Sequence, residues 1–162
     1  MGLKIKIQRT GNGGDTSSPS LWTVLTSGLL ARKWLGRAAP RLPQLPLEPA
    51  RNTLLYFRTR GCTVCGLIDM QVAAACHQSG VDLLIVDRYT KSDAPEDQTI
   101  YAQRGNILDF GGPINTAYQI GTYPSLVLIN SEGKIVLKDV GNRAKPDIYG
   151  EYLKNKFAVL LG

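Results

Sequence analysis

The chain has 162 residues, of which 43% are hydrophobic, so it suits one domain whose core needs neither disulfide staples nor a structural metal. Its three cysteines exclude a disulfide-stapled secreted module, which carries many cysteines in even number. The net charge of +6 arises in residues 1–51, which hold eight Lys and Arg against two acidic residues, whereas residues 52–162 hold eleven of each sign. Composition therefore predicts no basic face on the domain and no nucleic-acid partner.

Residues 1–19 become rich in Gly and Ser after a short alternating stretch, which predicts a flexible start. Residues 20–31 form an uncharged apolar run that is too short to span a membrane, since a spanning helix needs about 20 residues. Three interpretations stay open: a helix on or near the domain, a membrane-interface helix over residues 20–37, and a degraded signal sequence. The interface helix is favoured by two tryptophans and their basic neighbours: Trp22, Trp34, Arg32 and Lys33. The signal sequence is disfavoured, because the cleavage site that it needs is poor.

Four prolines at a period of three close this N-terminal region: Pro40, Pro43, Pro46 and Pro49. Prolines at this spacing favour an extended, semi-rigid connector. The sequence therefore predicts a flexible basic arm over residues 1–49, with a short apolar helix and a proline-rich connector. The folded domain is predicted over residues 50–162.

Beyond residue 50, apolar runs alternate with helical stretches, which indicates an α/β domain with a sheet covered by helices. Strands are predicted over residues 53–57, 81–86, 125–129 and 135–140, the last two as an antiparallel pair joined by a tight turn. Helices are predicted over residues 62–79, 95–104 and 146–160, the first of them ended by Gly80. Residues 107–115 are predicted to be loop-like, and residues 114–119 to form one helical turn.

Two cysteines three residues apart, Cys62 and Cys65, carry the strongest chemical signal. They follow the first predicted strand and open the first predicted helix. Unpaired backbone N–H groups and the positive end of the helix dipole stabilise a thiolate there, which predicts Cys62 as the nucleophile. Cys65, one turn later, is close enough to resolve a mixed disulfide. Arg58 and Arg60 come just before the pair and are expected to add a small positive potential if they are exposed.

A C-x-x-C pair also occurs in zinc sites, and two inert buried thiols are a further alternative. Zinc needs four ligands, and the only further candidates are Cys76 and His77, which would lie about 16 Å from Cys65 along the same helix. One helix cannot wrap these residues around one ion. We therefore predict no metal and no cofactor, with Cys76 as a small core residue and His77 on the helix surface.

Two motifs in a fixed order carry a resemblance to a known family. A strand, the C-x-x-C pair and a helix come first, and the sequence G-T-Y-P at residues 121–124 then leads into an apolar strand and an E-G-K turn. Over residues 50–160 the chain resembles the thioredoxin superfamily, and more narrowly its TlpA/ResA-like group. The resemblance implies a thioredoxin fold, a central mixed sheet flanked by helices, with a TlpA-like insertion between Val86 and Tyr118.

The resemblance also implies site residues. In this superfamily the proline before the fourth strand is cis and lies against the active-site disulfide, so Pro124 is expected in that role. Tyr123 before it is expected to pair with a substrate strand through main-chain hydrogen bonds. Gly61, Thr63 and Val64, around the cysteines, complete the predicted substrate-binding set.

The chain departs from the superfamily pattern at several positions. Plain thioredoxins carry a buried carboxylate in the strand before the cysteines, where this chain has Tyr56. Gly61 stands where an aromatic residue often precedes the first cysteine. The dipeptide between the cysteines, Thr63-Val64, is neither that of plain thioredoxin nor that of strong periplasmic oxidants. The direction of electron flow therefore stays open. Tyr123 is bulky for its position and is expected to narrow the substrate groove.

These observations predict a thiol–disulfide oxidoreductase that exchanges disulfides with protein substrates and with an electron-donor or acceptor protein. Two alternatives stay open: a redox-inert binding module that keeps the fold as a docking platform, and a membrane-tethered assembly factor attached through the basic arm. The resemblance implies an extracytoplasmic, membrane-attached location. The lack of a clean signal sequence or a full membrane span favours the cytosol instead.

Overall fold

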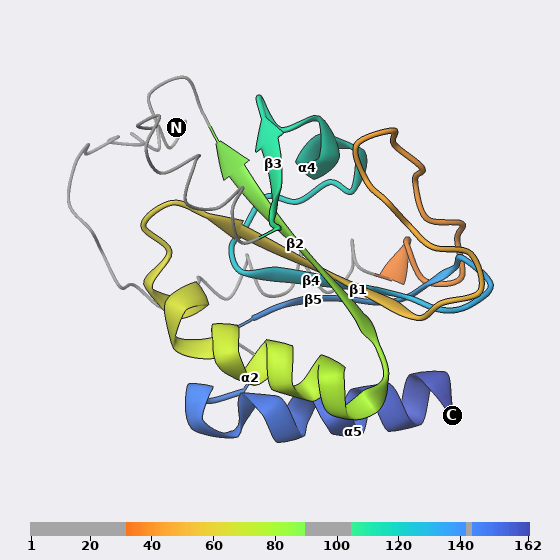
Figure 1. Cartoon of the computed structure of the whole chain (residues 1–162), viewed down its shortest axis with the longest axis vertical. Helices are drawn as coiled ribbons and strands as arrows, with labels where there is room; N and C mark the ends of the chain where they lie inside the picture. The colour runs from red at the N-terminus through yellow and green to blue at the C-terminus, as the bar shows by residue number, and fades with distance from the viewer. Residues whose placement is uncertain (1–31, 90–104, 142–143) are drawn as a thin grey trace, which may run out of the picture.

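The computed structural model describes residues 32–89, 105–141 and 144–162, which Figure 1 draws in colour. The predictions for residues 1–31 and for a helix over residues 95–104 lie outside these ranges. Among the helices of the described ranges, none has the length and apolar character that crossing a membrane requires.

One mixed five-stranded sheet forms the centre of the described structure. Its strands are β1 (Thr53–Thr59), β2 (Asp82–Tyr89), β3 (Ile107–Phe110), β4 (Ser125–Ile129) and β5 (Ile135–Val140). Their order across the sheet is β3-β2-β1-β4-β5. Strands β1, β2 and β3 are parallel, whereas β4 runs antiparallel to both β1 and β5. The carboxyl ends of β1 and β2 therefore lie at the same edge of the sheet, and the cysteine pair follows β1 at this edge.

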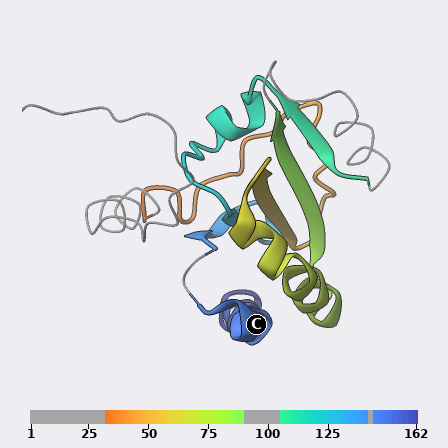
Figure 2. The same cartoon turned by 90° about the vertical axis from the view of Figure 1, so that its left-hand side faces the viewer.

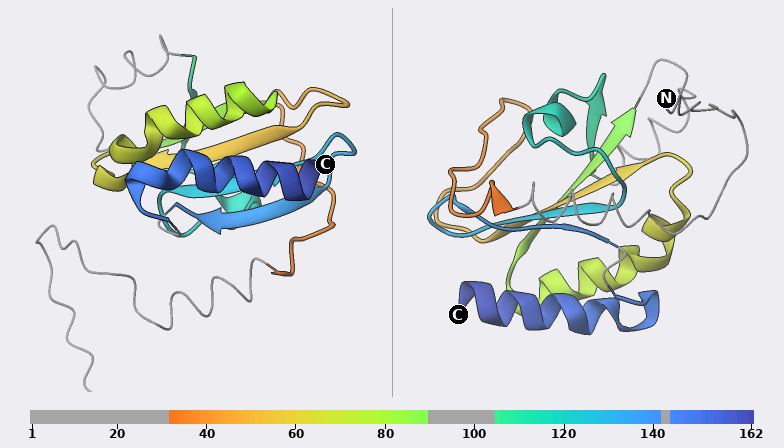
Figure 3. Two further views of the ribbon diagram at one scale, coloured as in Figure 1. Left: turned by 90° about the horizontal axis from the view of Figure 1, so that it is seen from below. Right: turned by 180° about the vertical axis from the view of Figure 1, so that it is seen from behind.

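Helices cover both faces of this sheet. On one face α2 (Thr63–Ser79) and α5 (Tyr149–Leu161) lie side by side, as Figures 1 and 3 show, and the short 3-10 helix η1 (Pro146–Ile148) leads into α5. The short helix α4 (Pro113–Ala117) lies on the other face (Figure 2). This is the mixed sheet flanked by helices that the resemblance implies.

The alternation of side chains along β1 divides the core between the two faces. Leu54 and Tyr56 pack with α2 and α5, whereas Leu55 and Phe57 pack on the face that carries α4. All four residues have 0% of their surface exposed. The register of β1 is thereby fixed, because a slip by one residue would exchange the two sets of side chains.

Residues 36–47, which we call the N-terminal strap, pack on the α4 face of the sheet. A backbone hydrogen bond from Gly36 N to Ile135 O, 2.8 Å long, ties the strap to β5. Ala39 and Leu45 are buried in the core on this face. The predicted boundary between residues 49 and 50 stays a prediction, and the structure adds that part of the predicted connector contacts the sheet.

Most predicted elements within the described ranges are confirmed, with one correction. β4 has its predicted bounds, and α2 has Cys62 as its N-cap residue and Gly80 as its C-cap residue. Residues 107–115 were expected to be loop-like, but Ile107–Phe110 form β3, which pairs in parallel with β2. The pattern misses β3 because the strand has only four residues, one of which is the buried Asp109, so it contains no apolar run.

Candidate active site

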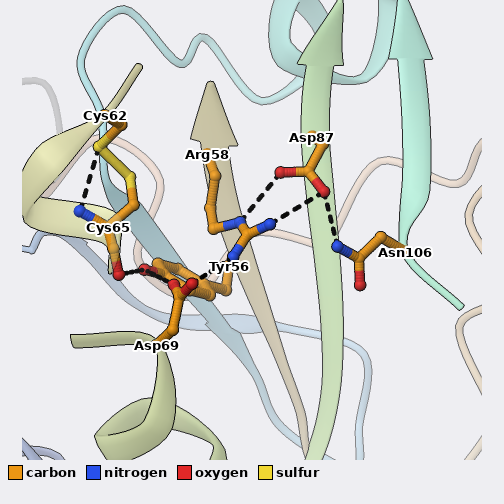
Figure 4. A network of polar contacts seen from close by, with 7 residues as sticks. All are labelled: Tyr56, Arg58, Cys62, Cys65, Asp69, Asp87 and Asn106. Carbon is orange, nitrogen blue, oxygen red and sulfur yellow. Dashed lines mark hydrogen bonds and ion pairs between the residues drawn. A yellow bond between two sulfur atoms is a disulfide. The ribbon is translucent and has the colours of Figure 1, made fainter. Parts of the chain in front are cut away.

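The cysteine pair lies where β1 passes into α2. Gly61 makes the turn with a φ of 71°, a left-handed conformation that glycine adopts without strain. Cys62 is the N-cap residue of α2, and Thr63 and Val64 are exposed in its first turn. Cys62 and Cys65 form a disulfide, with their Cα atoms 5.3 Å apart (Figure 4). The structure thus brings together the two cysteines that the sequence singles out.

The two sulfurs differ in their access to solvent and in their electrostatic surroundings. Cys65 is buried, with 4% of its surface exposed, whereas Cys62 is half-buried. The backbone N–H of Cys65 donates to Cys62 Sγ at 3.2 Å (Figure 4). In the reduced pair, this N–H and the helix dipole favour a negative charge on Cys62 Sγ. Of the two cysteines, Cys62 is therefore the more exposed and the one whose sulfur faces the helix N-terminus, and Cys65 is the sheltered one.

A polar network lies beside the disulfide, between β1, β2 and α2 (Figure 4). The Tyr56 hydroxyl donates to Asp69 Oδ1 at 2.7 Å and lies 3.1 Å from the carbonyl oxygen of Cys65. Arg58 Nη1 donates to Asp69 Oδ2 at 2.5 Å, and Arg58 Nε donates to Asp87 Oδ1 at 2.9 Å. The network therefore joins the helix turn after Cys65 to the two parallel strands beneath it.

Arg58 is the centre of this network and is buried, with 7% of its surface exposed. Burial by itself would lower the pKa of Arg58, but its bonds to Asp87 and Asp69 outweigh burial and raise it, so the guanidinium stays charged. Asp87 also accepts a hydrogen bond from Asn106 Nδ2 at 2.7 Å. Two carboxylates thus offset the charge of Arg58. Of the two arginines expected to add positive potential near Cys62, only Arg60 is exposed.

Tyr56 stands at the strand position where the resemblance implies a buried carboxylate. Burial and the bond to Asp69 raise the pKa of Tyr56, so its hydroxyl keeps its proton and acts as a donor. A carboxylate is nevertheless present, because Asp69 reaches this place from α2, one turn after Cys65. Sequence reasoning missed this network. The available signal was a pair of opposite charges, Arg58 and Asp87, within two neighbouring apolar strands.

A cavity of about 290 Å³ opens beside the disulfide. The ionisable and cysteine side chains that line it are Arg58, Arg60, Cys62, Cys65, Asp69, Asp87 and Tyr89. In liquid water each molecule takes up roughly 30 Å³, so the cavity has room for several water molecules. Both cysteines and the Asp69 carboxylate therefore border one space that water can enter.

The second predicted motif lies at the start of β4. The Tyr123–Pro124 peptide bond is cis, and Pro124 is buried. Gly141 lies so close to this proline that a Cβ at position 141 would be 2.4 Å from Pro124 Cγ and 3.0 Å from Ile68 Cδ1. Ile68 belongs to α2, one turn after Cys65. Pro124 and the helix that carries the cysteines thus share a close neighbour.

The side chain of Tyr123 is tied to α4. Its hydroxyl donates to Asn115 Oδ1 at 2.6 Å and accepts from Arg88 Nη1 at 3.4 Å. Asp109 of β3 holds Asn115 in turn, because it accepts from the backbone N–H and from Nδ2 of Asn115. The segment formed by β3 and α4 therefore fixes the residue before the cis-proline.

Cys76 is a core residue, as the sequence predicts. Only 1% of its surface is exposed, and burial raises its pKa to about 12. His77 is exposed in the last turn of α2, also as predicted. Since the thiolate is the nucleophile, we expect Cys76 to be unreactive in the folded chain at neutral pH. Within the ranges that the structure covers, no three His, Cys, Asp or Glu side chains are grouped so that they could hold a metal ion.

No protein-family model and no curated protein matches the chain, but solved structures do. A secreted disulfide oxidoreductase of Mycobacterium tuberculosis, homologous to E. coli DsbE, aligns with a TM-score of 0.52 and 18% identity, over 69% of this chain and 84% of its own. The thioredoxin domain of a Bacteroides vulgatus thiol–disulfide oxidoreductase aligns with a TM-score of 0.55 and 18% identity, over 79% of this chain and 98% of its own. A candidate thiol:disulfide interchange protein DsbE from Chlorobium tepidum aligns with a TM-score of 0.55 and 21% identity, over 79% of this chain and 98% of its own.

These likenesses define the architecture: the chain has a thioredoxin fold. The order and orientation of the five strands and the cysteine pair at the start of α2 accord with it. The three neighbours carry the names of disulfide oxidoreductases or interchange proteins.

Proposed function

We propose that the chain is a thiol–disulfide oxidoreductase that exchanges disulfides with protein substrates through Cys62 and Cys65. The observation that carries the proposal is the asymmetry of the pair. Cys62 is half-buried and its Sγ accepts a hydrogen bond at the helix N-terminus, while Cys65 is buried one turn later. Exchange needs this asymmetry, because one sulfur attacks as a thiolate and the other then resolves the mixed disulfide.

In the reducing direction, the Cys62 thiolate attacks one sulfur of a substrate disulfide. A bond forms between Cys62 Sγ and that sulfur, and the second substrate sulfur leaves as a thiolate. Cys65 then loses its proton and attacks Cys62 Sγ, which releases the first substrate sulfur and restores the Cys62–Cys65 disulfide. The pair loses two electrons and the substrate gains two. Oxidation of a substrate dithiol is the reverse, and an electron-donor or acceptor protein resets the pair.

We propose that an extended substrate segment docks along Tyr123 and Pro124 beside the pair. Main-chain hydrogen bonds to a residue such as Tyr123 would give affinity without a demand on sequence. The bond from the Tyr123 hydroxyl to Asn115 supports this role, because it holds the docking residue in one place. Gly61, Thr63 and Val64 are exposed around Cys62, which supports the proposal that they contact the same segment.

Reduction of insulin by dithiothreitol tests the proposed activity. We expect the full chain to catalyse this reduction, and Cys62→Ser to lose the catalysed rate because the attacking sulfur is gone. Cys65→Ser should instead accumulate a mixed disulfide with the substrate, visible by mass spectrometry. Cys76→Ala is the matched control: it removes a buried thiol, leaves the pair intact and should keep wild-type turnover.

Wild-type turnover by Cys62→Ser would contradict the proposal. So would a native chain that catalyses no exchange with insulin or with a small disulfide. The second result would favour a redox-inert module that uses the fold for binding.

A further inference from the structure

The Tyr123–Pro124 unit, where we propose that the substrate docks, is anchored on both faces of the sheet. The Tyr123 side chain packs against the core on the α4 face. Pro124 packs on the other side, because a Cβ at Gly141 would touch both this proline and Ile68 of α2. Gly141 N also donates to Pro124 O at 2.9 Å. The bulk of Tyr123 therefore lies on the opposite face from the helix that carries the cysteines.

Two polar side chains hold the Tyr123 hydroxyl in this place. The hydroxyl donates to Asn115 Oδ1 at 2.6 Å and accepts from Arg88 Nη1 at 3.4 Å. Asn115 is 2% exposed and is itself held by Asp109, which accepts from its backbone N–H and from its Nδ2. Because Asn115 belongs to α4 and Arg88 belongs to β2, the phenol is fixed from two elements.

Arg88 occupies its place at a cost to stability. Its Nε is buried and has no hydrogen-bond acceptor within the described part of the chain, and an unpaired buried donor is unfavourable. Gly112, at the start of α4, leaves room for this arginine, since a Cβ at position 112 would lie 3.4 Å from Arg88 Nε. Groups that a fold keeps although they destabilise it are concentrated at functional sites. Arg88 is therefore better explained by its bond to Tyr123 than by what it adds to the fold.

We infer that Arg88 and Asn115 are positioning residues for substrate binding, an inference that rests on the proposed function. Through the phenol they fix the main chain of Tyr123, which has Pro124 as its second anchor. A docking main chain gains affinity when its N–H and C=O groups are oriented before the substrate arrives, because ordering them on binding costs entropy. The tether therefore raises the affinity for the substrate and leaves the exchange at Cys62 unchanged.

The tether also defines the class of substrate that gains from it. Main-chain hydrogen bonds recognise the peptide groups of an extended segment rather than its side chains. A disulfide within an extended, exposed segment of a protein therefore gains affinity from the tethered Tyr123. A small disulfide without peptide groups gains none.

Two substrates separate docking from chemistry. Insulin offers disulfides within peptide segments, whereas 5,5′-dithiobis(2-nitrobenzoic acid) has no peptide group. Tyr123→Phe keeps the ring and removes the tethered hydroxyl. We expect its KM for insulin, in reduction by dithiothreitol, to rise about threefold to tenfold with kcat unchanged, which is the effect of one hydrogen bond on affinity. Its stopped-flow rate with the small disulfide should equal that of wild type.

Variants of the two tethering residues test whether they act through the phenol. Arg88→Met and Asn115→Ala should each raise the KM for insulin in the wild-type chain. Neither should raise it further in the Tyr123→Phe background, because the hydroxyl through which they act is gone. Arg88→Met should be at least as stable as wild type towards urea, since the unpaired Nε is removed, and it carries the test if Asn115→Ala does not fold.

Tyr118→Phe is the matched control. The Tyr118 hydroxyl lies on the same face of the sheet but donates to Pro40 O of the N-terminal strap, at 2.8 Å. Its loss should leave both the KM for insulin and the rate with the small disulfide at their wild-type values.

A wild-type KM in Tyr123→Phe would overturn the inference. So would an equal fall in the rates with insulin and with the small disulfide, because that result places the defect at the cysteine pair. A further rise in KM when Arg88→Met is added to Tyr123→Phe would overturn the role of Arg88. All three outcomes leave the proposed function intact, whereas a wild-type chain that reacts with neither substrate would overturn the proposed function itself.

Discussion

Cys62 and Cys76 belong to opposite ends of α2 and lie in opposite environments. Cys62 is half-buried and accepts a hydrogen bond from a helix N–H, whereas Cys76 is enclosed in the core with 1% of its surface exposed. The helix N-terminus favours a thiolate at Cys62, and burial raises the pKa of Cys76 to about 12. One helix thus carries a thiol placed to react and a thiol kept protonated.

Replacement of Cys76 by alanine should change how stability depends on pH in alkaline solution. The fold raises the pKa of Cys76 from 9.0 to about 12, so above pH 9 the unfolded chain loses a proton that the folded chain keeps. The stability of wild type relative to Cys76→Ala is therefore constant below pH 9 and falls above it, by about 1.4 kcal/mol per pH unit. Urea unfolding of both proteins at about pH 8 and about pH 10.5 measures this fall. A difference that does not vary with pH would contradict the burial of the thiol.

Gly141→Ala should destabilise the fold beside Pro124. The new Cβ would lie 2.4 Å from Pro124 Cγ, and the hydrogen bond from Gly141 N to Pro124 O, 2.9 Å long, keeps the two backbones together. Overpacking of this kind costs about 1–3 kcal/mol. Urea unfolding measures the loss, with Gly66→Ala as control, because a Cβ at Gly66 meets nothing within 4 Å and alanine favours a helix interior. Equal stability of Gly141→Ala and wild type would contradict the contact.

At the scale of elements, β3 supports α4 through one buried carboxylate. Asp109 is 1% exposed and accepts hydrogen bonds from the backbone N–H groups of Ile114 and Asn115. These groups lie in the first turn of α4, where the helix itself provides no acceptor. Asn115 then accepts from the Tyr123 hydroxyl, so the position of Tyr123 depends on β3 through α4.

Asp109→Ala should loosen α4 and lower the free energy of unfolding by about 1–3 kcal/mol, because buried N–H groups lose their acceptor. Amide hydrogen exchange should show faster exchange at Ile114 and Asn115. Asp147→Ala, at an exposed site in η1, is the control and should have little effect on stability. Unchanged protection of the Ile114 amide in Asp109→Ala would show that Asp109 does not hold α4.

Local patterns predict elements, but they do not predict the contacts between them. β4 was predictable because a run of apolar residues is bounded by Pro124 and Asn130. Leu67 and Met70 helped to predict α2, yet they are 58% and 85% exposed, because the packing of the helix on the sheet decides which side is buried. The sequence pattern therefore locates a helix but does not show which elements pack against it.

The polar network could not be predicted for the same reason. Arg58 meets Asp87 because the register of β1 and β2 makes them partners, and Asp69 joins them only because α2 crosses β1 at that point. The cysteine pair could be predicted, since its chemistry depends on four consecutive positions at the start of one helix. Its supporting carboxylate depends on long-range packing, which no local pattern contains.

At the scale of the whole molecule, the N-terminal strap belongs to the folding unit. It supplies Leu45, 4% exposed, to the core between the sheet and α4, and its backbone pairs beside β5. The strap thereby covers the start of β5 at Ile135, where it takes up the backbone groups of an outer sheet edge.

Leu45→Ala should therefore destabilise the whole domain by about 2–5 kcal/mol, as for other buried leucines. Urea unfolding followed by tryptophan fluorescence measures this loss. Leu35→Ala is the matched control, because Leu35 is 47% exposed and its truncation should cost much less. If the two variants unfolded at the same urea concentration, the strap would not be part of the cooperative core.

The rate of alkylation of each cysteine against pH tests the central claim most directly. The fully reduced native chain is treated with iodoacetamide, and mass spectrometry follows Cys62 and Cys76 separately. We predict that Cys62 reacts at neutral pH, with a rate that levels off below about pH 8.5, where an ordinary thiol ionises. Cys76 should stay unmodified over the same range. Equal rates at Cys62 and Cys76, or a Cys62 rate that rises only above about pH 8.5, would contradict the account.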